Sequence, residues 1–508
     1  MRTVFLVLHS LGRAGRSAAV IEQCRMFLAL GLKPVIVTFT YEPRFTSGLA
    51  ARKGDFALPA GVEVRNIFHD LQQAATQDQD ADWSREQDLD REGLLVSTIR
   101  IEGGERSEYF DRAGRLVKRR EVKDGRTASL ALFEHARPVV RREYEDSGAC
   151  GRERTLDPAT GATIEERYFT PDGICYVTRY LEPASGRQLG AYVHHATSGQ
   201  SVRYSHNTPW HAAWLDQVLA AESPRPLVIA QHPTAMTKLL DTDPAHSSRL
   251  FLSHVNIYQE PYGPGAPLRT DYAQPFRRVE EMPVVLSLTE AQARDMRTTF
   301  GPDRCDPLVI PNVVRDRRTD TSIATVSGRV GIVCRLSATQ KRVDHLLCAW
   351  PRVVAAVPRA HLEIGGHGGA RQDLEELSAT LGIRDSVTFL GWLDDSVDLM
   401  ASCVLTVSTG RSEGFGLSIG ESLAAGTPVV SYDIDYGPSD LIRDGVDGAL
   451  VPDGDHEALA RGIIRLLRRE RRAARAGRSA AERMAREFSP EVLAARWSTA
   501  FALADTRS

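Results

Sequence analysis

The sequence has little of what marks a secreted, membrane-spanning or zinc-binding protein. Its seven cysteines are an odd number and are scattered without a C-x-x-C pair, so they indicate neither a disulfide framework nor a zinc site. No run of about 18 apolar residues occurs, which argues against a membrane-spanning helix. The apolar run from Val4 to Leu8 is too short for a secretion signal and is predicted to be a first buried strand. We therefore expect a cytoplasmic protein whose cysteines are small buried side chains.

The chain also lacks a strong charge of either sign. A net charge of −3 over 508 residues, with 42% hydrophobic and 25% charged residues, is typical of a globular protein and indicates no nucleic-acid partner. The length predicts about three domains. Arginine is concentrated in the run RLLRRERRAARAGRSAAERMAREF near the C-terminal end. This run is either a solvated helix, which its interleaved glutamates favour, or a helix in peripheral contact with the inner face of an anionic membrane.

Strands and helices alternate in two parts of the chain. Residues 1–75 and 203–314 contain apolar runs such as TVFLVL and PLVIAQ separated by helical patterns, which predicts one Rossmann-like domain split by an insertion. Residues 315–485 repeat the pattern from GRVGIVC to GALVP and are predicted to form a second such domain. Residues 486–508 are predicted to be a helix that packs back on the first domain. Because ligands of these sheets bind at the carboxyl ends of the strands, the cleft between the domains is the expected active site.

The inserted segment, residues 76–202, has a different pattern. It begins with a polar linker, after which short strands alternate with Gly-containing turns in the units EYFDRAGRLVKRREV, REYEDSGACGRERTLD and ERYFTPDGICYVTRYLE. Successive hairpins of this kind predict an antiparallel β-meander. The predicted fold class is therefore α/β, with two Rossmann-like domains facing a cleft and a β-meander inserted in the N-terminal one.

The most informative segment is SEGFGLSIGESLAAGTPVVS, in which Glu413 and Glu421 lie on either side of a Gly-rich turn. The glycines leave backbone N–H groups open to a phosphate, and carboxylates accept hydrogen bonds from hydroxyl groups. The segment therefore suits a ligand that carries both phosphates and hydroxyls. The alternative is that one glutamate caps a helix and the other is a solvated helix residue.

A second segment, RLSATQKR, follows the apolar strand RVGIVC. Arg335 and either Lys341 or Arg342 emerge there at a strand end that faces the same cleft. Two cations at this place would neutralise a diphosphate, both when it binds and when negative charge grows on it as a sugar bond breaks. Solvated basic residues are the alternative, and the two glutamates of the same domain argue against it.

Taken together, Arg335, Lys341 and the runs EGFGLSIGE, AAGTPVV and IPN resemble the GT-B glycosyltransferases of family 4. The resemblance covers both α/β domains. It implies that glucose or N-acetylglucosamine is transferred from a UDP-sugar to a hydroxyl of a polymer or protein acceptor, with retention of configuration and with no metal bound by the protein. Arg342 stays open as a diphosphate ligand, because Lys341 comes six residues after Arg335 rather than the usual five.

The resemblance also implies a role for each motif residue. Arg335 and Lys341 would hold the diphosphate, Glu413 the hydroxyls of the donor sugar, and Glu421 the ribose. The turn between the two glutamates would supply backbone amides near the sugar and phosphate, and its residues are Gly414, Phe415, Gly416 and Leu417.

Two features of the first domain suit the same cleft. His254, in the strand RLFLSHVNIYQ, falls where similar enzymes place a histidine beside the transferred sugar, although a structural histidine is the alternative. Gly12 and Gly15, in HSLGRAGRS, would let the backbone approach the donor, or else they form a tight turn without ligand contact. They do not form G-x-G-x-x-G, so no dinucleotide site is predicted.

The hairpin units resemble the β-meander of bacterial enzymes that glycosylate poly(ribitol phosphate) or poly(glycerol phosphate) wall teichoic acids or serine-rich adhesins. This resemblance implies a homo-oligomer formed through the meander, or capture of the acceptor by it, and a polyol-phosphate cell-wall polymer as acceptor. The alternatives are a nucleotide-sugar epimerase or sugar phosphorylase on the same fold, and a non-catalytic acceptor-binding subunit.

Acidic D-x-D triplets are the remaining candidates for a metal site. The overlapping triplets from Asp78 to Asp82 lie in the polar linker and are interpreted as solvated. Asp433 and Asp435 follow the strand PVVSY and are the better candidates. The basic pair already offers charge compensation without a metal, so no metal is expected.

Overall fold

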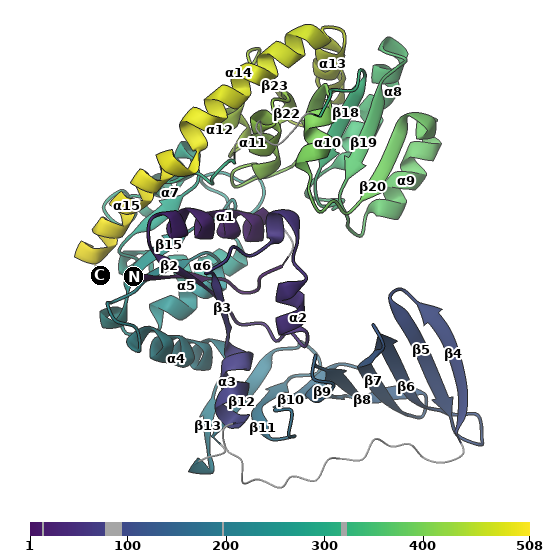
Figure 1. The fold of residues 1–508 in the computed structure, drawn as a ribbon, viewed down its shortest axis with the longest axis vertical. Coiled ribbons are helices and arrows are strands. Elements are labelled where there is room, and N and C mark those ends of the chain that lie inside the picture. Colours follow the sequence, from purple (N-terminus) through teal and green to yellow (C-terminus); the bar gives the residue numbers. More distant parts are fainter. Residues whose placement is uncertain (13–14, 77–93, 196–197, 316–322, 508) are drawn as a thin grey trace.

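A computed structural model of the chain describes residues 1–12, 15–76, 94–195, 198–315 and 323–507 (Figure 1). It contains two parallel sheets and a long antiparallel one, whose strands are inserted between the third and fourth strands of the first parallel sheet in sequence order. The predicted α/β fold class with an inserted meander is confirmed.

The first parallel sheet has seven strands in the order β17-β16-β15-β14-β1-β2-β3. Its central strands are fully buried apolar runs, TVFLV in β1 and LVIA in β14, because helices cover both faces of the sheet. The strands are β1 (Thr3–Val7), β2 (Lys33–Thr38), β3 (Glu63–Asn66), β14 (Leu227–Ala230), β15 (Ser248–Leu252), β16 (Val285–Ser287) and β17 (Leu308–Val309). The helices are α1 (Gly15–Ala29), α2 (Phe45–Ala50), α3 (Ile67–Thr76), α4 (Asn207–Ala220), α5 (Pro233–Leu240), α6 (Thr270–Phe276) and α7 (Glu290–Phe300).

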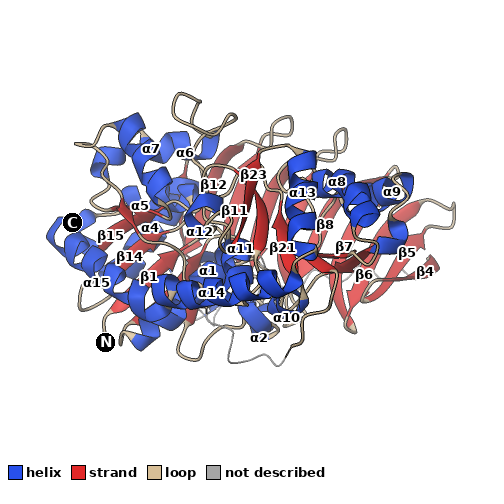
Figure 2. Ribbon diagram, turned by 90° about the horizontal axis from the view of Figure 1, so that it is seen from above, coloured by secondary structure: helices blue, strands red, loops and turns tan. Residues whose placement is uncertain are grey.

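The antiparallel sheet is a meander in which each strand pairs with its neighbours in sequence, from β4 to β13. It extends away from the first parallel sheet and ends at β4 (Figures 1 and 2). Its strands are β4 (Leu95–Ile101), β5 (Gly104–Phe110), β6 (Leu116–Lys123), β7 (Arg126–Glu134), β8 (Arg137–Tyr144), β9 (Cys150–Leu156), β10 (Thr163–Phe169), β11 (Cys175–Leu181), β12 (Gln188–His195) and β13 (Gln200–Tyr204). Gly114, Gly148 and Gly173 have positive φ in the turns of the three hairpins that the sequence predicts.

The second parallel sheet has six strands in the order β20-β19-β18-β21-β22-β23. Its strands are β18 (Arg329–Val333), β19 (His361–Gly365), β20 (Val387–Gly391), β21 (Leu405–Ser408), β22 (Val429–Asp433) and β23 (Gly448–Pro452). The helices that follow β17 are α8 (Val343–Ala356), α9 (Arg371–Thr380), α10 (Val397–Ser402), α11 (Leu417–Ala424), α12 (Pro438–Leu441), α13 (His456–Leu467), α14 (Glu470–Phe488) and α15 (Pro490–Arg507). None of the described helices is both long and apolar enough to cross a bilayer.

The chain passes from the first parallel sheet to the second before β18 and returns between α14 and α15 (Figure 1). The two crossings meet, because the amide of Val314 donates a hydrogen bond of 3.0 Å to the carbonyl of Phe488. On its return the chain packs α15 on the first domain, where the ring of Trp497 meets the edge of Phe27 at 5.2 Å. The two ends of the chain lie close together (Figure 1), and an ion pair of 2.6 Å joins Arg2 to Asp505.

The arginine-rich run forms α13 and α14, and one of its arginines is not solvated. Arg483 is 4% exposed and pairs with Asp447, which has no exposed surface. A second bond from Arg483 reaches the carbonyl of Leu441 at the end of α12. The expectation of a fully solvated helix is therefore wrong at this residue, because the side chain satisfies a buried carboxylate and a helix end.

Candidate active site

Three neighbouring strands of the first sheet lead into a histidine at the same edge. His9, His232 and His254 each come two residues after the last residue of β1, β14 and β15. These strands are adjacent and parallel, so their carboxyl ends share one edge. The rings of His9 and His232 stack with their centroids 5.8 Å apart. The histidines therefore form a row where ligands of open α/β sheets bind.

His254 is held as a neutral ring. The amide nitrogen of Gln231 donates a hydrogen bond to Gln23, which leaves its oxygen, Oε1, as an acceptor. Nε2 of His254 donates to this oxygen at 2.7 Å. Burial, together with the positive charge of Arg16 and the neighbouring His232, lowers the pKa of His254 to about 3. The side chain is 8% exposed. It can therefore hydrogen-bond a hydroxyl, but it carries no charge at neutral pH.

Arg16, in the first turn of α1, adds a positive charge beside this row. Burial lowers the pKa of its guanidinium, which still remains charged at neutral pH. Its Nε is buried without a hydrogen-bond partner. Sequence reasoning missed Arg16, His9 and His232. The repeated sequence of apolar strand, one residue and histidine, in LVLH, IAQH and FLSH, is the signal that could have found the histidines.

Lys341 and Glu413 form an ion pair in the second domain. They lie on the loops after β18 and β21, which are adjacent strands, so the two loops share one sheet edge. Nζ of Lys341 donates to Oε1 of Glu413, and their side chains are 20% and 15% exposed. Burial disfavours the charged amine, but the attraction and hydrogen bond of Glu413 outweigh it and raise the pKa of Lys341. The structure therefore brings together two of the predicted site residues.

The two neighbouring arginines are placed very differently. Arg342 is 9% exposed and points into the domain, where it donates to the carbonyls of Thr409 at 3.0 Å and Gly410 at 2.8 Å and pairs with Asp453. Arg335 is exposed and donates to the side chain of Gln340. Arg342 thus fixes the loop that carries Glu413, whereas Arg335 remains at the surface beside Lys341.

The Gly-rich turn joins the two domains at the histidine row. A Cβ on Gly414 would lie 1.9 Å from the carbonyl oxygen of His254, so this backbone contact requires glycine. Phe415 is 3% exposed and its ring packs near that of Phe488 at 5.9 Å, so only its backbone is available to a ligand. Gly416 is the N-cap of α11 and has a φ of 85°. The N-terminal end of α11, which begins after it, presents free backbone amides.

Glu421 and Gly15 lie along the seam between the domains, whereas Gly12 contacts Arg52 of its own domain. Glu421 lines a cavity of about 20 Å³ between α11 and α1, which has room for about one water molecule and not for a nucleoside. Cδ1 of Leu417 lies 3.5 Å from the position of a Cβ on Gly15. The carbonyl of Gly12 accepts a hydrogen bond of 3.3 Å from Arg52, and the two residues between these glycines lie outside the described part.

The acidic triplets form no grouped site. In the part of the chain that the structure describes, no three His, Cys, Asp or Glu side chains are arranged to hold a metal ion. Asp433 and Asp435 are both exposed at the end of β22. Asp78, Asp80 and Asp82 lie outside the described residues.

Comparison with known proteins agrees with this architecture. Residues 320–483 match the family described as "Glycosyl transferases group 1". The chain is 22% identical to the poly(ribitol-phosphate) alpha-N-acetylglucosaminyltransferase of Staphylococcus aureus, over 99% of this chain and 100% of the relative. It is 29% identical to the poly(glycerol-phosphate) alpha-glucosyltransferase of Bacillus subtilis, over 42% of this chain and 32% of the relative.

The fold extends along the whole chain. A variant of TarM from S. aureus, solved in complex with fondaparinux, alpha-GlcNAc-glycerol and UDP, matches it with a TM-score of 0.85 at 20% identity, covering 99% of this chain and 100% of the other. The second domain therefore matches the group 1 glycosyltransferase family, and the whole chain has the GT-B fold of the solved relative.

Proposed function

We propose that the protein transfers glucose or N-acetylglucosamine from a UDP-sugar to a hydroxyl of a polyol-phosphate polymer, with retention of anomeric configuration. The observation that carries the proposal is the seating of Gly414 on the His254 carbonyl. This contact sets the loop of the Lys341–Glu413 pair against the histidine row of the other domain. A donor sugar held at the loop would then face an acceptor held at the row.

The charges at the loop suit a nucleotide-sugar donor. Arg335 is exposed beside Lys341, and both would bind the diphosphate and stabilise the charge that it gains as the sugar leaves. Lys341 would be the second cation rather than Arg342, because Arg342 bonds to backbone carbonyls inside the domain, whereas Lys341 pairs with Glu413 at the sheet edge. Glu413 would exchange part of its bond to Lys341 for the hydroxyls of the sugar.

The remaining predicted residues surround these groups. The amides that begin α11 would contact the phosphate or sugar. His254 is neutral and donates its N–H to Gln231, so its Nδ1 would accept a hydrogen bond from a sugar hydroxyl. A ribose at Glu421 needs the seam between α11 and α1 to widen, since the cavity there is about 20 Å³. Gly15 faces the same seam, and it would border the donor together with Gly12, which precedes it in the chain.

An acceptor that carries phosphates agrees with the charge on the other side of the cleft. Arg16 has no carboxylate within ion-pair distance among the described residues, and its Nε has no hydrogen-bond partner. A phosphate of the acceptor would supply a negative charge for the guanidinium and an oxygen that accepts a hydrogen bond from its Nε. The names of the two curated relatives, which act on poly(ribitol phosphate) and poly(glycerol phosphate), support the same acceptor class.

A homo-oligomer formed through the meander is part of the proposal. β4 is an edge strand of the sheet, and its Leu95, Val96 and Ile99 are 60%, 55% and 53% exposed. An apolar edge strand of this kind pairs readily with another chain. Charged substitutions at Val96 and Ile99 are expected to shift the mass measured by light scattering to that of one chain, and an unchanged mass would contradict this contact.

The direct test of the function is transfer from UDP-glucose and UDP-N-acetylglucosamine to ribitol-phosphate and glycerol-phosphate oligomers. The product is analysed by NMR, in which the α configuration of the new bond is expected if configuration is retained. An Arg335→Ala variant is expected to lower turnover about 100-fold to 1,000-fold, by analogy with the loss of one preorganised charge donor. Absence of transfer to every acceptor, or near-normal turnover in that variant, would overturn the proposal.

A further inference from the structure

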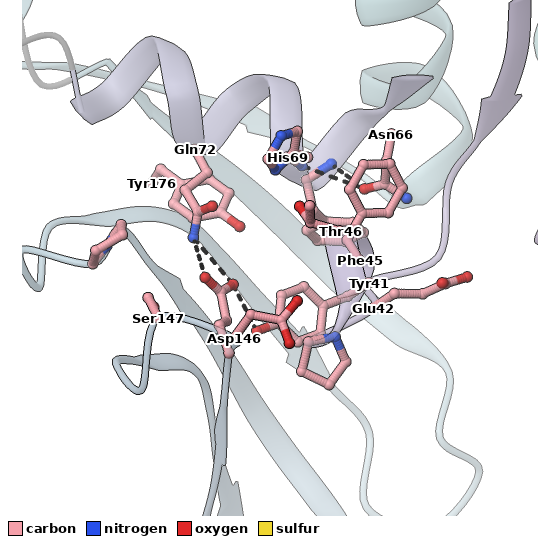
Figure 3. Close-up of a pocket in the computed structure, with 14 residues that line it drawn as sticks. Tyr41, Glu42, Phe45, Thr46, Asn66, His69, Gln72, Asp146, Ser147 and Tyr176 are labelled. Atoms are coloured by element: carbon pink, nitrogen blue, oxygen red, sulfur yellow. Dashed lines mark hydrogen bonds between the residues drawn. The ribbon is translucent and has the colours of Figure 1, made fainter. Parts of the chain in front are cut away.

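A cavity of about 200 Å³ lies where the first domain meets the meander (Figure 3). The first domain contributes Tyr41 and Phe45 at the start of α2 and Gln72 from α3, and the meander contributes Glu145 from the β8–β9 turn and Tyr176 from β11. The cavity is smaller than the about 300–1,000 Å³ of pockets for drug-sized ligands. It therefore suits a group of the size of one sugar ring or one polyol unit.

The charge of the lining selects against phosphate. Three carboxylates, those of Glu42, Glu145 and Asp146, line the cavity, and neither lysine nor arginine is among its lining residues. A phosphate would be repelled here, whereas hydroxyl groups donate hydrogen bonds to carboxylates. The aromatic walls offer apolar surface to the C–H faces of a sugar or polyol.

The carboxylate of Glu145 is held in place before any ligand binds. The amide of Gln72 donates to its two oxygens at 3.1 and 3.0 Å, and the hydroxyl of Tyr41 donates to Oε1 at 3.0 Å (Figure 3). A Cβ on Gly151 would lie 2.3 Å from Oε1 and 2.1 Å from the Tyr41 hydroxyl, so this arrangement requires glycine there. Within the described part Oε2 receives only the Gln72 bond, which leaves room for another donor.

The hydroxyl of Tyr176 points to an occupant of the cavity. The side chain is 1% exposed, and its oxygen is buried without a hydrogen-bond partner. Buried hydroxyl groups in native proteins are nearly always hydrogen-bonded. A hydroxyl-bearing ligand in the cavity would satisfy this group, which no side chain of the described protein does.

The cavity also lies close to the catalytic cleft. Its wall includes Phe45, the first residue of α2, and Arg52, just beyond the end of that helix, hydrogen-bonds the carbonyl of Gly12, three residues after His9 of the histidine row. A six-residue helix spans about 9 Å. A polymer bound in the cleft could therefore reach the cavity with a unit a short distance along its chain.

We propose that this junction cavity binds a neutral, hydroxyl-rich unit of the acceptor, away from the hydroxyl that receives the sugar. The unit is a polyol of the backbone or a sugar already attached to it, since both have this chemistry. The inference rests on the proposed function, from which it takes the acceptor. It gives the enzyme a second point of contact that favours long acceptors over single units.

The sharpest test is Tyr176→Phe, which removes one oxygen atom that has no internal partner and therefore leaves the folded protein intact. The Michaelis constant for a ribitol-phosphate oligomer is expected to rise about threefold to tenfold, the loss of one hydrogen bond. The constants for UDP-sugar and for a single ribitol phosphate are expected to stay unchanged. Tyr180→Phe is the matched control, because Tyr180 lies on the same strand, is 41% exposed and does not line the cavity.

Equal constants for the oligomer in Tyr176→Phe and the wild type, or an equal rise in Tyr180→Phe, would overturn the inference. Oligomers with and without attached sugars distinguish the two ligands, the backbone polyol and the attached sugar. The rise in the Michaelis constant depends on attached sugar only if the cavity binds the sugar. Calorimetric titration of the oligomers without donor separates the two proposals. If the wild type transfers to no acceptor and yet binds the oligomer more tightly than Tyr176→Phe does, the proposed function is wrong but the cavity is still a binding site.

Discussion

Replacing Lys341 by Met tests both the stability of the Lys341–Glu413 pair and the role proposed for it in transfer. The substitution keeps the length of the side chain but leaves the Glu413 carboxylate, 15% exposed, without its ammonium partner. Breaking a buried ion pair from one side costs about 3–5 kcal/mol. Because both side chains keep some contact with solvent, we expect a smaller loss, about 2–3 kcal/mol, in the free energy of unfolding of the second domain.

The double variant Lys341→Met/Glu413→Gln is the matched control. It removes both charges, so its stability is expected to return to within about 1 kcal/mol of the wild type. Turnover is expected to fall about 100-fold to 1,000-fold in both variants, because neither can stabilise the departing diphosphate with this lysine. Stability is measured by urea unfolding and turnover by release of UDP.

The two outcomes separate structure from chemistry. If Lys341→Met is as stable as the wild type, the Glu413 carboxylate does not need the ammonium of Lys341 to compensate its burial. Recovery of turnover in the double variant would refute the role of Lys341, since the loss would then come from the unpaired glutamate. Loss of activity with restored stability is the result that the geometry predicts.

Three further predictions concern the cleft. Gly414→Ala is expected to lower turnover and donor affinity about tenfold or more, because its Cβ would meet the His254 carbonyl at 1.9 Å, whereas Gly369→Ala, with nothing within 4 Å, should behave as wild type in the same assay. Burial lowers the pKa of Lys238 to about 7, so its proton favours the unfolded chain and the free energy of unfolding should rise between about pH 7 and 10. Lys238→Met should be more stable than the wild type at pH 7, with a gap that narrows toward pH 10 in urea titrations, and a constant gap would contradict burial as the cause. Since the pKa of His254 is about 3, the pH profile of turnover between pH 5 and 8 should keep its shape in His254→Gln while turnover falls, and a step near pH 6 that disappears in this variant would contradict a neutral ring.

Local structure could be predicted because local residues determine it. The helix from Glu290 to Phe300 begins and ends as its sequence indicates: the Thr289 hydroxyl accepts from the amide of Gln292 at 3.1 Å, and Gly301 follows with a φ of 82°. The buried strands are likewise visible as short apolar runs, and the hairpins as strands joined by Gly-containing turns.

The contacts that build the site depend on strand order, which no local pattern contains. The row of His9, His232 and His254 exists because β1 lies beside β14, although more than 200 residues separate them in the chain. The sequence likewise does not say where the side chain of Arg342 points. Only the folded domain places the carbonyls of Thr409 and Gly410 where they accept hydrogen bonds from its guanidinium. Residue type and spacing could single out the candidate donor motif, but not which of its cations bonds inside the domain and which lies at the sheet edge.

The hydrogen bond between Val314 and Phe488 has a mechanical consequence. The chain enters the second parallel-sheet domain and leaves it at places that this bond joins, so a rotation of one half relative to the other would have its pivot there. Lys341 and Glu413 both lie on one side of the pivot, whereas the seat of Gly414 on the His254 carbonyl spans the two halves. Turning about the pivot would therefore separate Gly414 from the His254 carbonyl and carry the ion pair along unbroken. If the proposed function holds, binding of the diphosphate and the meeting of sugar with acceptor would then be separable events.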